Sequence, residues 1–202
     1  MWDRFVYHLG IDVGLQWGGK ISWESTEEKA KTLREQVSQL QRWGYPTRMV
    51  DASELASLEP GLSLGPVVAA EYSEIEGHVE QERVVHACVT RVVEGGGGMH
   101  DNTQVTALPV TPSDQKVRVV ETDRGEIPCD VVVLAAGTEM TKLAALCGIH
   151  LPQEESPGVV IRTSPLAQLF QSVPVVYAPA LDAEHSEIHI RQTSDGVVMI
   201  GE

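Results

Sequence analysis

The stretch Lys116–Gly137, KVRVVETDRGEIPCDVVVLAAG, decides the predicted fold of this chain. The turn residues Asp123-Arg124-Gly125 predict a β-hairpin in its first half. The run Val131–Leu134 is apolar on both faces, as expected of a central parallel strand that is covered on both sides. Ala135–Gly137 at its carboxyl end lack bulk, and open α/β sheets bind ligands at that position. The alternative is a strand-to-helix turn that packs tightly for its own sake.

The residues upstream of this stretch predict a helix, a break and a strand. Apolar side chains recur at helical spacing and form one face, at Val84, Val85, Cys88, Val89 and Val92. The run Gly95–Gly98 breaks this helix, and Thr103–Leu108 alternates like a strand. The order is therefore helix, strand, hairpin and buried strand.

The flanking regions predict further helices and an antiparallel sheet. The chain opens on an amphipathic helix that Gly10 ends, and Ser25 with Glu28 forms a capping box for a second helix. Asp51 caps a shorter helix, and His78 is read as a turn residue. Four short strands follow residue 158, at Val159–Arg162, Val173–Tyr177, Glu187–Arg191 and Val197–Ile200.

Taken in order, these elements resemble a known enzyme family. Three further segments fit the same pattern: Gly18–Ile21 (GGKI), Asp51–Leu62 (DASELASLEPGL) and Ile188–Gly201 (IHIRQTSDGVVMIG). The chain resembles the FAD-dependent oxidoreductases of amines and amino acids, which include glycine oxidase, sarcosine oxidase, D-amino acid dehydrogenase and dimethylglycine dehydrogenase. The resemblance spans essentially the whole sequence.

The resemblance implies an α/β plus α+β fold. A partial Rossmann-like flavin-binding domain is expected at residues 1–10 and 77–150. A mostly antiparallel β-sheet substrate domain is expected at residues 11–76 and 151–202, so both domains are discontinuous. Within the first, Val131–Leu134 is expected to run parallel to another strand.

Two motifs of the family have no counterpart in the sequence. The family begins with a strand, a G-x-G-x-x-G turn and a helix that seats the flavin pyrophosphate. Gly95–Gly98 follow a helix instead of a strand and are not that turn. The family's later RP-x-x-x-DG-x-P segment, with its carboxylate-binding arginine, is also unmatched. We therefore expect a central fragment that binds FAD weakly or not at all by itself, with the remainder of its domain or another subunit as a partner.

The resemblance implies four cofactor-binding residues. Val105 matches a strand whose backbone amide and carbonyl lie against the adenine. The alternative is a plain core valine, and both can hold because backbone contacts leave the side chain free. The turn that packs against the ribityl and pyrophosphate region is matched by Ala135, Ala136 and Gly137. Glu139 stands where an aromatic residue often follows, and its carboxylate would repel a cofactor phosphate.

The resemblance also implies His189 as a catalytic and substrate-binding residue. His189 matches a tyrosine that faces the substrate, and a neutral imidazole could accept a hydrogen bond from the amine or shuttle a proton. Arg191 shares its face and could hold a substrate carboxylate. The alternatives are a surface histidine and an arginine paired with a surface acid. Alternation places Glu187 with these two residues, and Ile188 and Ile190 on the opposite face.

Two classes of function follow. In the first, a flavin takes a hydride from the α-carbon of a deprotonated amine or amino acid and leaves an imine that water hydrolyses. No strong side-chain base is required. In the second, the chain is a non-catalytic or truncated protein that keeps part of the fold and binds no flavin. Glycine, sarcosine, a D-amino acid, proline and a 2-hydroxy acid are all open as substrates.

Composition excludes several other classes. The chain has 202 residues, with 15 Lys and Arg against 29 Asp and Glu, and its formal net charge of −14 argues against nucleic acid and anionic membranes as partners. It has neither an apolar run of membrane-spanning length nor a signal-peptide pattern, which predicts a cytoplasmic location. Cys88, Cys129 and Cys147 are scattered and odd in number, so we expect buried free thiols and no metal site.

Overall fold

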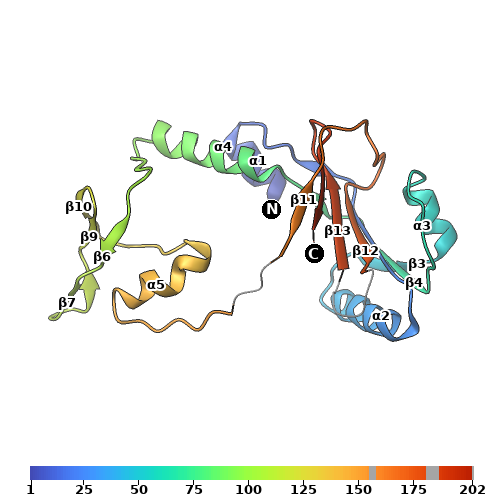
Figure 1. Ribbon diagram of the computed structural model, residues 1–202, viewed down its shortest axis with the longest axis horizontal. Helices are drawn as coiled ribbons and strands as arrows, with labels where there is room; N and C mark the ends of the chain where they lie inside the picture. The colour runs from blue at the N-terminus through green and yellow to red at the C-terminus, as the bar shows by residue number, and fades with distance from the viewer. Residues whose placement is uncertain (155–157, 181–186, 202) are drawn as a thin grey trace. The chain divides into compact units, whose positions relative to one another are not determined.

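The computed structural model describes residues 1–154, 158–180 and 187–201 (Figure 1). The chain forms two compact units, which we call unit 1 (Met1–Gly95 and Gly158–Glu202) and unit 2 (Gly96–Pro157). Unit 2 is thus an insertion in the sequence of unit 1. The predicted division into cofactor and substrate domains stays a prediction. Of the predicted substrate domain, residues 155–157, 181–186 and 202 lie outside the described residues.

Unit 1 is built on a seven-stranded sheet with the order β11-β14-β13-β12-β2-β4-β3. Its strands are β2 (Lys20–Glu24), β3 (Thr47–Val50), β4 (Ala69–Ser73), β11 (Val160–Arg162), β12 (Val175–Pro179), β13 (Glu187–Gln192) and β14 (Val198–Gly201). Every neighbouring pair is antiparallel except β12 and β2. The prediction that two distant segments share one mostly antiparallel sheet is confirmed.

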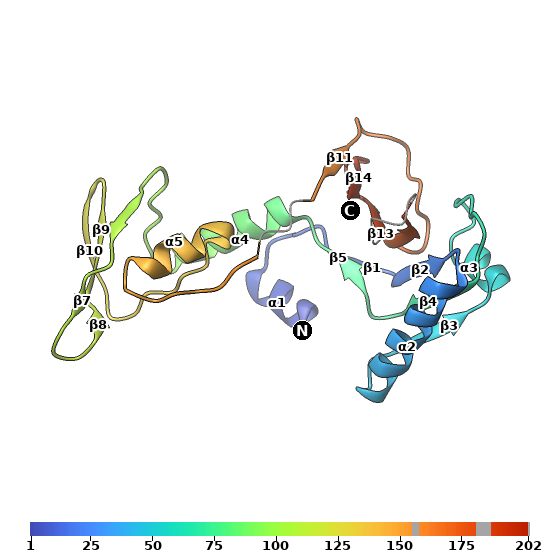
Figure 2. The ribbon, with the colours of Figure 1, turned by 60° about the horizontal axis from the view of Figure 1, so that its bottom comes forward.

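Two helices pack on opposite faces of this sheet (Figures 1 and 2). Helix α3 (Ala52–Leu58) places Leu55 in a core with Ile21, Val176 and their neighbours, and Ile190 packs against this core. Helix α2 (Glu27–Arg42) packs its apolar face against Ala69. Alternation along β4 sends Ala69, Glu71 and Ser73 to the α2 face, so that face is largely polar.

The caps of these helices follow from single residues. The Asp51 side chain accepts a hydrogen bond from the Glu54 amide at 2.8 Å, as predicted. The N-cap of α2 is Thr26, which accepts from the Lys29 amide at 3.4 Å, and not the predicted Ser25. The cap lies one residue later because the helix begins at Glu27, so only Thr26 is in position to reach that amide.

A smaller part of unit 1 joins two helices to a short strand pair. Helix α1 (Trp2–Leu9) ends at Gly10, whose φ of 58° is left-handed, and it packs against α4 (Gln81–Glu94). Strands β1 (Gln16–Trp17) and β5 (Gly77–His78) pair antiparallel, as Figure 2 shows.

The predicted apolar face of α4 is only half buried. Val84 and Cys88 pack towards α1, whereas Val85 and Val92 are 62% and 53% exposed. The predicted helix is present, but only part of its apolar face is covered. The physical reason is that α1 is a short helix and covers one side of this wide apolar stripe.

Unit 2 contains an antiparallel three-stranded sheet in the order β10-β9-β6. Its elements are β6 (Val105–Ala107), β7 (Val110–Thr111), β8 (Lys116–Val117), β9 (Val119–Thr122), β10 (Gly125–Pro128), η1 (Gly137–Glu139) and α5 (Met140–Ala145). Gly125 pairs with Thr122 across the turn and has a φ of 126°, which confirms the predicted hairpin and its glycine.

The predicted parallel strand Val131–Leu134 is wrong. These residues form no strand, and Val131 and Val133 are 77% and 81% exposed. Valine has a high β-propensity, but a strand exists only where its backbone groups pair with a neighbour. No strand among the described residues pairs with this segment.

Candidate functional site

A concave surface that contains the predicted site residues His189 and Arg191 lies over β12 and β13. We call it the β13 recess; its volume is about 260 Å³. It is lined by Glu76, Gly77, His78, Val160, Val175, Tyr177, His189, Ile190, Arg191, Met199 and Gly201. All of these residues belong to unit 1.

His189 is held in this recess by a cross-strand aromatic pair. It lies directly opposite Tyr177 on β12, and the two ring centroids are 4.2 Å apart with an interplanar angle of 43°. The neighbouring Ile190 packs against the core. His189 is exposed and lines the recess, and Ile190, which packs against the core, also contributes to its lining. The catalytic role of His189 stays a prediction.

Arg191 is half buried and lines the same recess. Its guanidinium has neither a hydrogen bond nor an ion pair among the described residues, whereas Arg48 and Arg83 each pair with a carboxylate at 2.6 Å. An unpaired guanidinium is unexpected in a chain with a net charge of −14. Such a group is suited to bidentate binding of a carboxylate.

A buried carboxylate supports the sheet beside the recess. Glu71 is 3% exposed and accepts hydrogen bonds from Ser22 at 3.0 Å and Ser73 at 2.9 Å. It also pairs with Lys20 at 3.3 Å, and the Lys20 ammonium lies 5.3 Å from the centroid of the Tyr177 ring. A chain of contacts therefore runs from Glu71 through Lys20 to the ring on which His189 stacks.

The pKa of Glu71 reflects this network. Burial alone would raise it, but the hydrogen bond from Thr47, the charge of Lys20 and the hydroxyls of Ser73 and Ser22 outweigh burial and lower the pKa below its ordinary value. The carboxylate is therefore ionised in the folded chain at neutral pH.

His78, read from the sequence as a turn residue, is a buried residue of the recess. It is 7% exposed, and its Nε2 atom lies 3.1 Å from the carbonyl oxygen of Gln192. Burial and then the charge of Arg191 lower the pKa of His78. The sequence signal for this placement is weak, because β1 and β5 comprise only two residues each.

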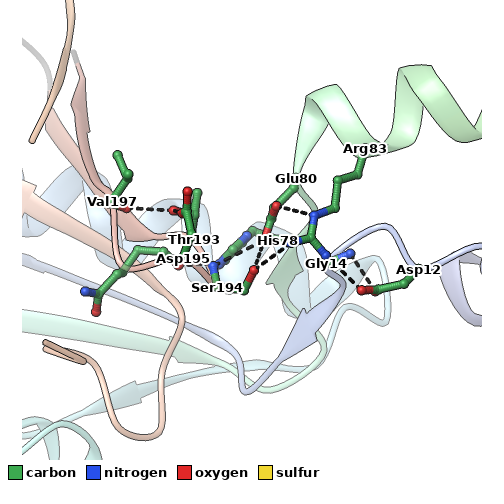
Figure 3. Close-up of polar contacts among 10 residues, drawn as sticks. Asp12, Gly14, His78, Glu80, Arg83, Thr193, Ser194, Asp195 and Val197 are labelled. Carbon is green, nitrogen blue, oxygen red and sulfur yellow. Dashed lines mark hydrogen bonds and ion pairs between the residues drawn. The ribbon is translucent and has the colours of Figure 1, made fainter. Parts of the chain in front are cut away.

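A polar cluster fixes the end of β13 (Figure 3). Arg83 donates to Asp12 at 2.8 Å and to Ser194 at 3.1 Å, and it pairs with Glu80 at 2.6 Å. Glu80 in turn accepts from the Ser194 hydroxyl at 2.5 Å. These contacts tie the start of α4 and the segment before β1 to the turn that follows Gln192. They thereby restrict the backbone that carries Arg191.

Glu59, in the EPGL segment, holds the loop that leads into β12. It is fully buried and accepts hydrogen bonds from the backbone amides of Gln171 at 2.9 Å, Ser172 at 2.9 Å and Val173 at 3.0 Å. Three amides that converge on one carboxylate form an anion-binding nest within the chain itself. The role of Glu59 is thus structural.

The four predicted cofactor residues belong to unit 2, whereas His189 and Arg191 belong to unit 1. Val105 is half buried on β6, which is an edge strand, so one side of its backbone is unpaired within the described sheet. Ala135, Ala136 and Gly137 are exposed. Gly137 has a φ of 57°, and a Cβ atom there would meet nothing within 4 Å.

This open turn fits the close approach of a flavin's ribityl and pyrophosphate region. Glu139, which was expected to repel a phosphate, is paired with Lys142: the two carboxylate oxygens lie 2.8 and 2.9 Å from the ammonium. The pairing offsets much of the negative charge beside the turn. The role of these four residues in binding FAD stays a prediction.

Other groups in the described residues give no sign of metal or disulfide chemistry. Cys88, Cys129 and Cys147 are free thiols and half buried. No group of three His, Cys, Asp or Glu residues among those described is arranged to hold a metal ion. In the same residues, no helix combines the length and apolar character needed to cross a membrane.

Known proteins are similar to this chain in sequence or in fold. The chain is 26% identical over 196 residues to a subunit of opine oxidase from Agrobacterium tumefaciens (strain Ach5), covering 96% of the chain and 48% of that protein. It is 30% identical over 139 residues to the mitochondrial pyruvate dehydrogenase phosphatase regulatory subunit of Mus musculus, covering 67% of the chain and 16% of that protein. The crystal structure of L-proline dehydrogenase from P. horikoshii superposes with a TM-score of 0.82 at 19% identity, covering 98% of the chain and 51% of that structure.

The chain therefore spans about half the length of the opine oxidase polypeptide that it matches. The family described as FAD dependent oxidoreductase (DAO) matches all of residues 1–202. This match agrees with the resemblance found along the sequence and with the mostly antiparallel sheet of unit 1. The chain belongs to the DAO family of FAD-dependent oxidoreductases.

Proposed function

We propose that this chain supplies the substrate-binding side of a flavoenzyme that oxidises the C–N bond of an amino acid or a secondary amine by hydride transfer to FAD. The observation that carries the proposal is the β13 recess, in which Arg191 is half buried without an anionic partner among the described residues, beside the stacked His189. Family membership and the names of the relatives support the reaction class.

The recess offers one group for each end of an amino acid. Arg191 binds the carboxylate through two parallel N–H···O hydrogen bonds. His189, as a neutral imidazole, accepts a hydrogen bond from the amine or takes up its proton. FAD would supply the hydride acceptor for the α-carbon when bound. Because the hydride leaves an amine that is already deprotonated, the chain needs no strong base, and water would hydrolyse the resulting imine.

We further propose that this chain alone binds FAD weakly, although its residues fit part of the cofactor. Val105 on an edge strand and the open turn at Ala135, Ala136 and Gly137 offer backbone contacts. The sequence has no G-x-G-x-x-G turn, and its net charge of −14 opposes a pyrophosphate. Titration of the purified chain with FAD, followed by flavin fluorescence, should give a dissociation constant above about 1 µM. A tighter constant would contradict this proposal.

The substrate proposal is tested by binding. Glycine, sarcosine and L-proline are titrated into the chain while NMR shifts of the recess residues are recorded. Arg191→Ala should weaken the binding of all three by about tenfold or more, because a charge-assisted bidentate contact is lost. Arg42→Ala, an exposed arginine at the end of α2, is the matched control and should leave binding unchanged. If Arg191→Ala binds as the wild type does, the recess is not the substrate site.

A second candidate is a non-catalytic protein of the same fold. The similarity to a protein named as a regulatory subunit favours it. The two candidates differ in amine-dependent flavin reduction, which only the enzyme shows. The opine oxidase relative, which is named as one subunit, also supports a second polypeptide as a partner of this chain. A cytoplasmic location is part of the same proposal.

A further inference from the structure

A second concave surface adjoins the β13 recess and is rich in aromatic and aliphatic residues. Its volume is about 380 Å³, and we call it the aromatic recess. It shares four lining residues with the β13 recess, namely Glu76, Gly77, His78 and Arg191, and all of its lining residues belong to unit 1. The two recesses therefore share one wall. The apolar residues that line the aromatic recess are Trp2, Leu15, Trp17, Tyr45, Ile75 and Val79.

The indole ring of Trp17 lies against this shared wall. Trp17 on β1 pairs with Gly77 on β5, and its ring atom Cε3 lies 3.1 Å from the position that a Cβ atom of residue 77 would occupy. Because glycine has no Cβ atom, the indole packs directly on the Gly77 backbone. Gly77 lines both recesses, so the Trp17 ring stands beside the boundary between them.

The aromatic side chains present apolar surface to this recess because their polar atoms already have partners within the chain. The Trp17 Nε1–H group donates to the Asp3 carboxylate at 2.9 Å, and the Tyr45 hydroxyl donates to the Glu76 carboxylate. With these hydrogen bonds made, what the rings offer a ligand is their apolar faces. Trp2, Trp17 and Ile75 are 40%, 45% and 52% exposed, so this apolar surface is accessible.

The charges on the shared wall restrict the ligand further. Arg191 has no anionic partner among the described residues and lines both recesses. A carboxylate bound by Arg191 is therefore held at the wall from which the aromatic recess opens. The Glu76 carboxylate lines the same wall and repels a second negative charge. The ligand that fits has one carboxylate and an uncharged apolar side chain.

We propose that the aromatic recess determines the substrate class, which is an amino acid with a large apolar side chain that lies against the Trp17 indole while Arg191 holds its carboxylate. This inference rests on the proposed function and narrows the range of amino acids that the sequence leaves open. A recess of about 380 Å³ is of the size that small ligands occupy in proteins. Glycine and sarcosine have no side chain to fill it. Trp17 is then a specificity-determining residue.

The test compares three kinds of amino acid as probes of the whole chain. Glycine has the carboxylate alone, phenylalanine adds a large apolar side chain, and glutamate adds a negatively charged one. Phenylalanine and glutamate are each used as both enantiomers, and dissociation constants are measured by NMR titration. The better phenylalanine enantiomer should bind about tenfold more tightly than glycine, because its side chain leaves water. Neither glutamate enantiomer should bind more tightly than glycine.

Variants of Trp17 connect this preference to the indole. Trp17→Ala should weaken phenylalanine binding about tenfold and leave glycine binding unchanged. Trp17→Phe keeps an aromatic ring at the wall and should restore most of the preference. Trp43→Ala, which removes a 74% exposed tryptophan at the end of α2, is the matched control and should change neither constant. If Trp17→Ala weakens both probes equally, the role of Trp17 is structural and the inference is overturned.

A spectroscopic readout in the wild-type chain needs no variant that might disturb folding. The Nε1–H resonance of the Trp17 indole should move when phenylalanine is added and stay in place when glycine is added. A resonance that ignores phenylalanine overturns the inference, as does glutamate binding that is tighter than phenylalanine binding.

Failure of this inference is distinguishable from failure of the proposed function. If glycine and phenylalanine bind the wild-type chain equally and both need Arg191, the inference is overturned and the proposed function stands. If none of the amino acids binds the wild-type chain, both are overturned.

Discussion

Replacing Glu59 should destabilise unit 1 through the loop that leads into β12. In Glu59→Leu, the side chain keeps its approximate volume but no longer accepts from the three amides. The Val173 amide is buried, so it loses a charge-assisted hydrogen bond worth about 2 kcal/mol. Gln171 and Ser172 lie at the surface, where water replaces the lost contact and the cost is about 0.5 kcal/mol each. The expected loss is about 3 kcal/mol.

The conservative variant should be milder. Glu59→Gln keeps one oxygen for Ser172 and Val173 but without the negative charge, so the loss should be about 1 kcal/mol. Glu28→Leu, an exposed residue of α2, is the control and should change stability by less than about 0.5 kcal/mol.

The assay is urea unfolding followed by tryptophan fluorescence. All four tryptophans, at positions 2, 17, 23 and 43, lie in unit 1, so the signal reports on this unit alone. Hydrogen exchange at the Val173 amide should accelerate in Glu59→Leu. The reasoning is refuted if Glu59→Leu is no less stable than Glu28→Leu, or if the Val173 amide stays protected.

Three further outcomes are expected. Gly77→Ala brings a Cβ atom to 2.3 Å from a carbonyl and should cost about 2 kcal/mol in the same urea assay, whereas Gly65→Ala, which meets nothing within 4 Å, should cost less than about 0.5 kcal/mol. The pKa of Glu71 is lower in the folded chain than in the unfolded chain, so the stability that Glu71 contributes is present above the unfolded pKa and is lost as the pH falls through the folded pKa. Glu71→Gln should therefore lose less stability than the wild type as the pH falls below 4.5. Circular dichroism measures this, and an identical pH profile of the two proteins would refute it. Burial, and after it the hydrogen bond to Glu76, raises the pKa of Tyr45 to about 12, so an ultraviolet titration should show one tyrosine that ionises near that pH. The stability that Tyr45 contributes is complete below pH 10 and should disappear as the pH rises towards 12. Glu76→Gln should lower the pKa of Tyr45.

Local signals in the sequence predicted much of the fold. The Asp51 cap, the Gly10 helix end and the Asp123–Gly125 turn depend on residues that are adjacent in the chain, and each is present. The strands after residue 158 were also predicted, because alternation and turn residues act over a few positions. The same alternation predicted which face of β13 carries His189.

Features that depend on residues far apart in the sequence were not predicted. Val131–Leu134 has the composition of a strand, yet pairing depends on a partner elsewhere, and none is found in the described residues. The burial of His78 depends on Gln192, far along the chain. The unpaired state of Arg191 is likewise invisible in a sequence rich in acids, because it is set by which acids reach the recess.

The parallel pair β2–β12 has a consequence for the order of synthesis. Lys20 pairs with Val175, so the ribosome must make all of unit 2 before the sheet of unit 1 can close. Strands β2, β4 and β3 with α2 and α3 are complete early and can form a nascent sheet whose β2 edge is open. The unpaired backbone groups at this edge of β2 can pair with strands of other nascent chains until β12 emerges from the ribosome. Chaperone dependence of this protein should therefore be greatest while residues 96–157 are being translated.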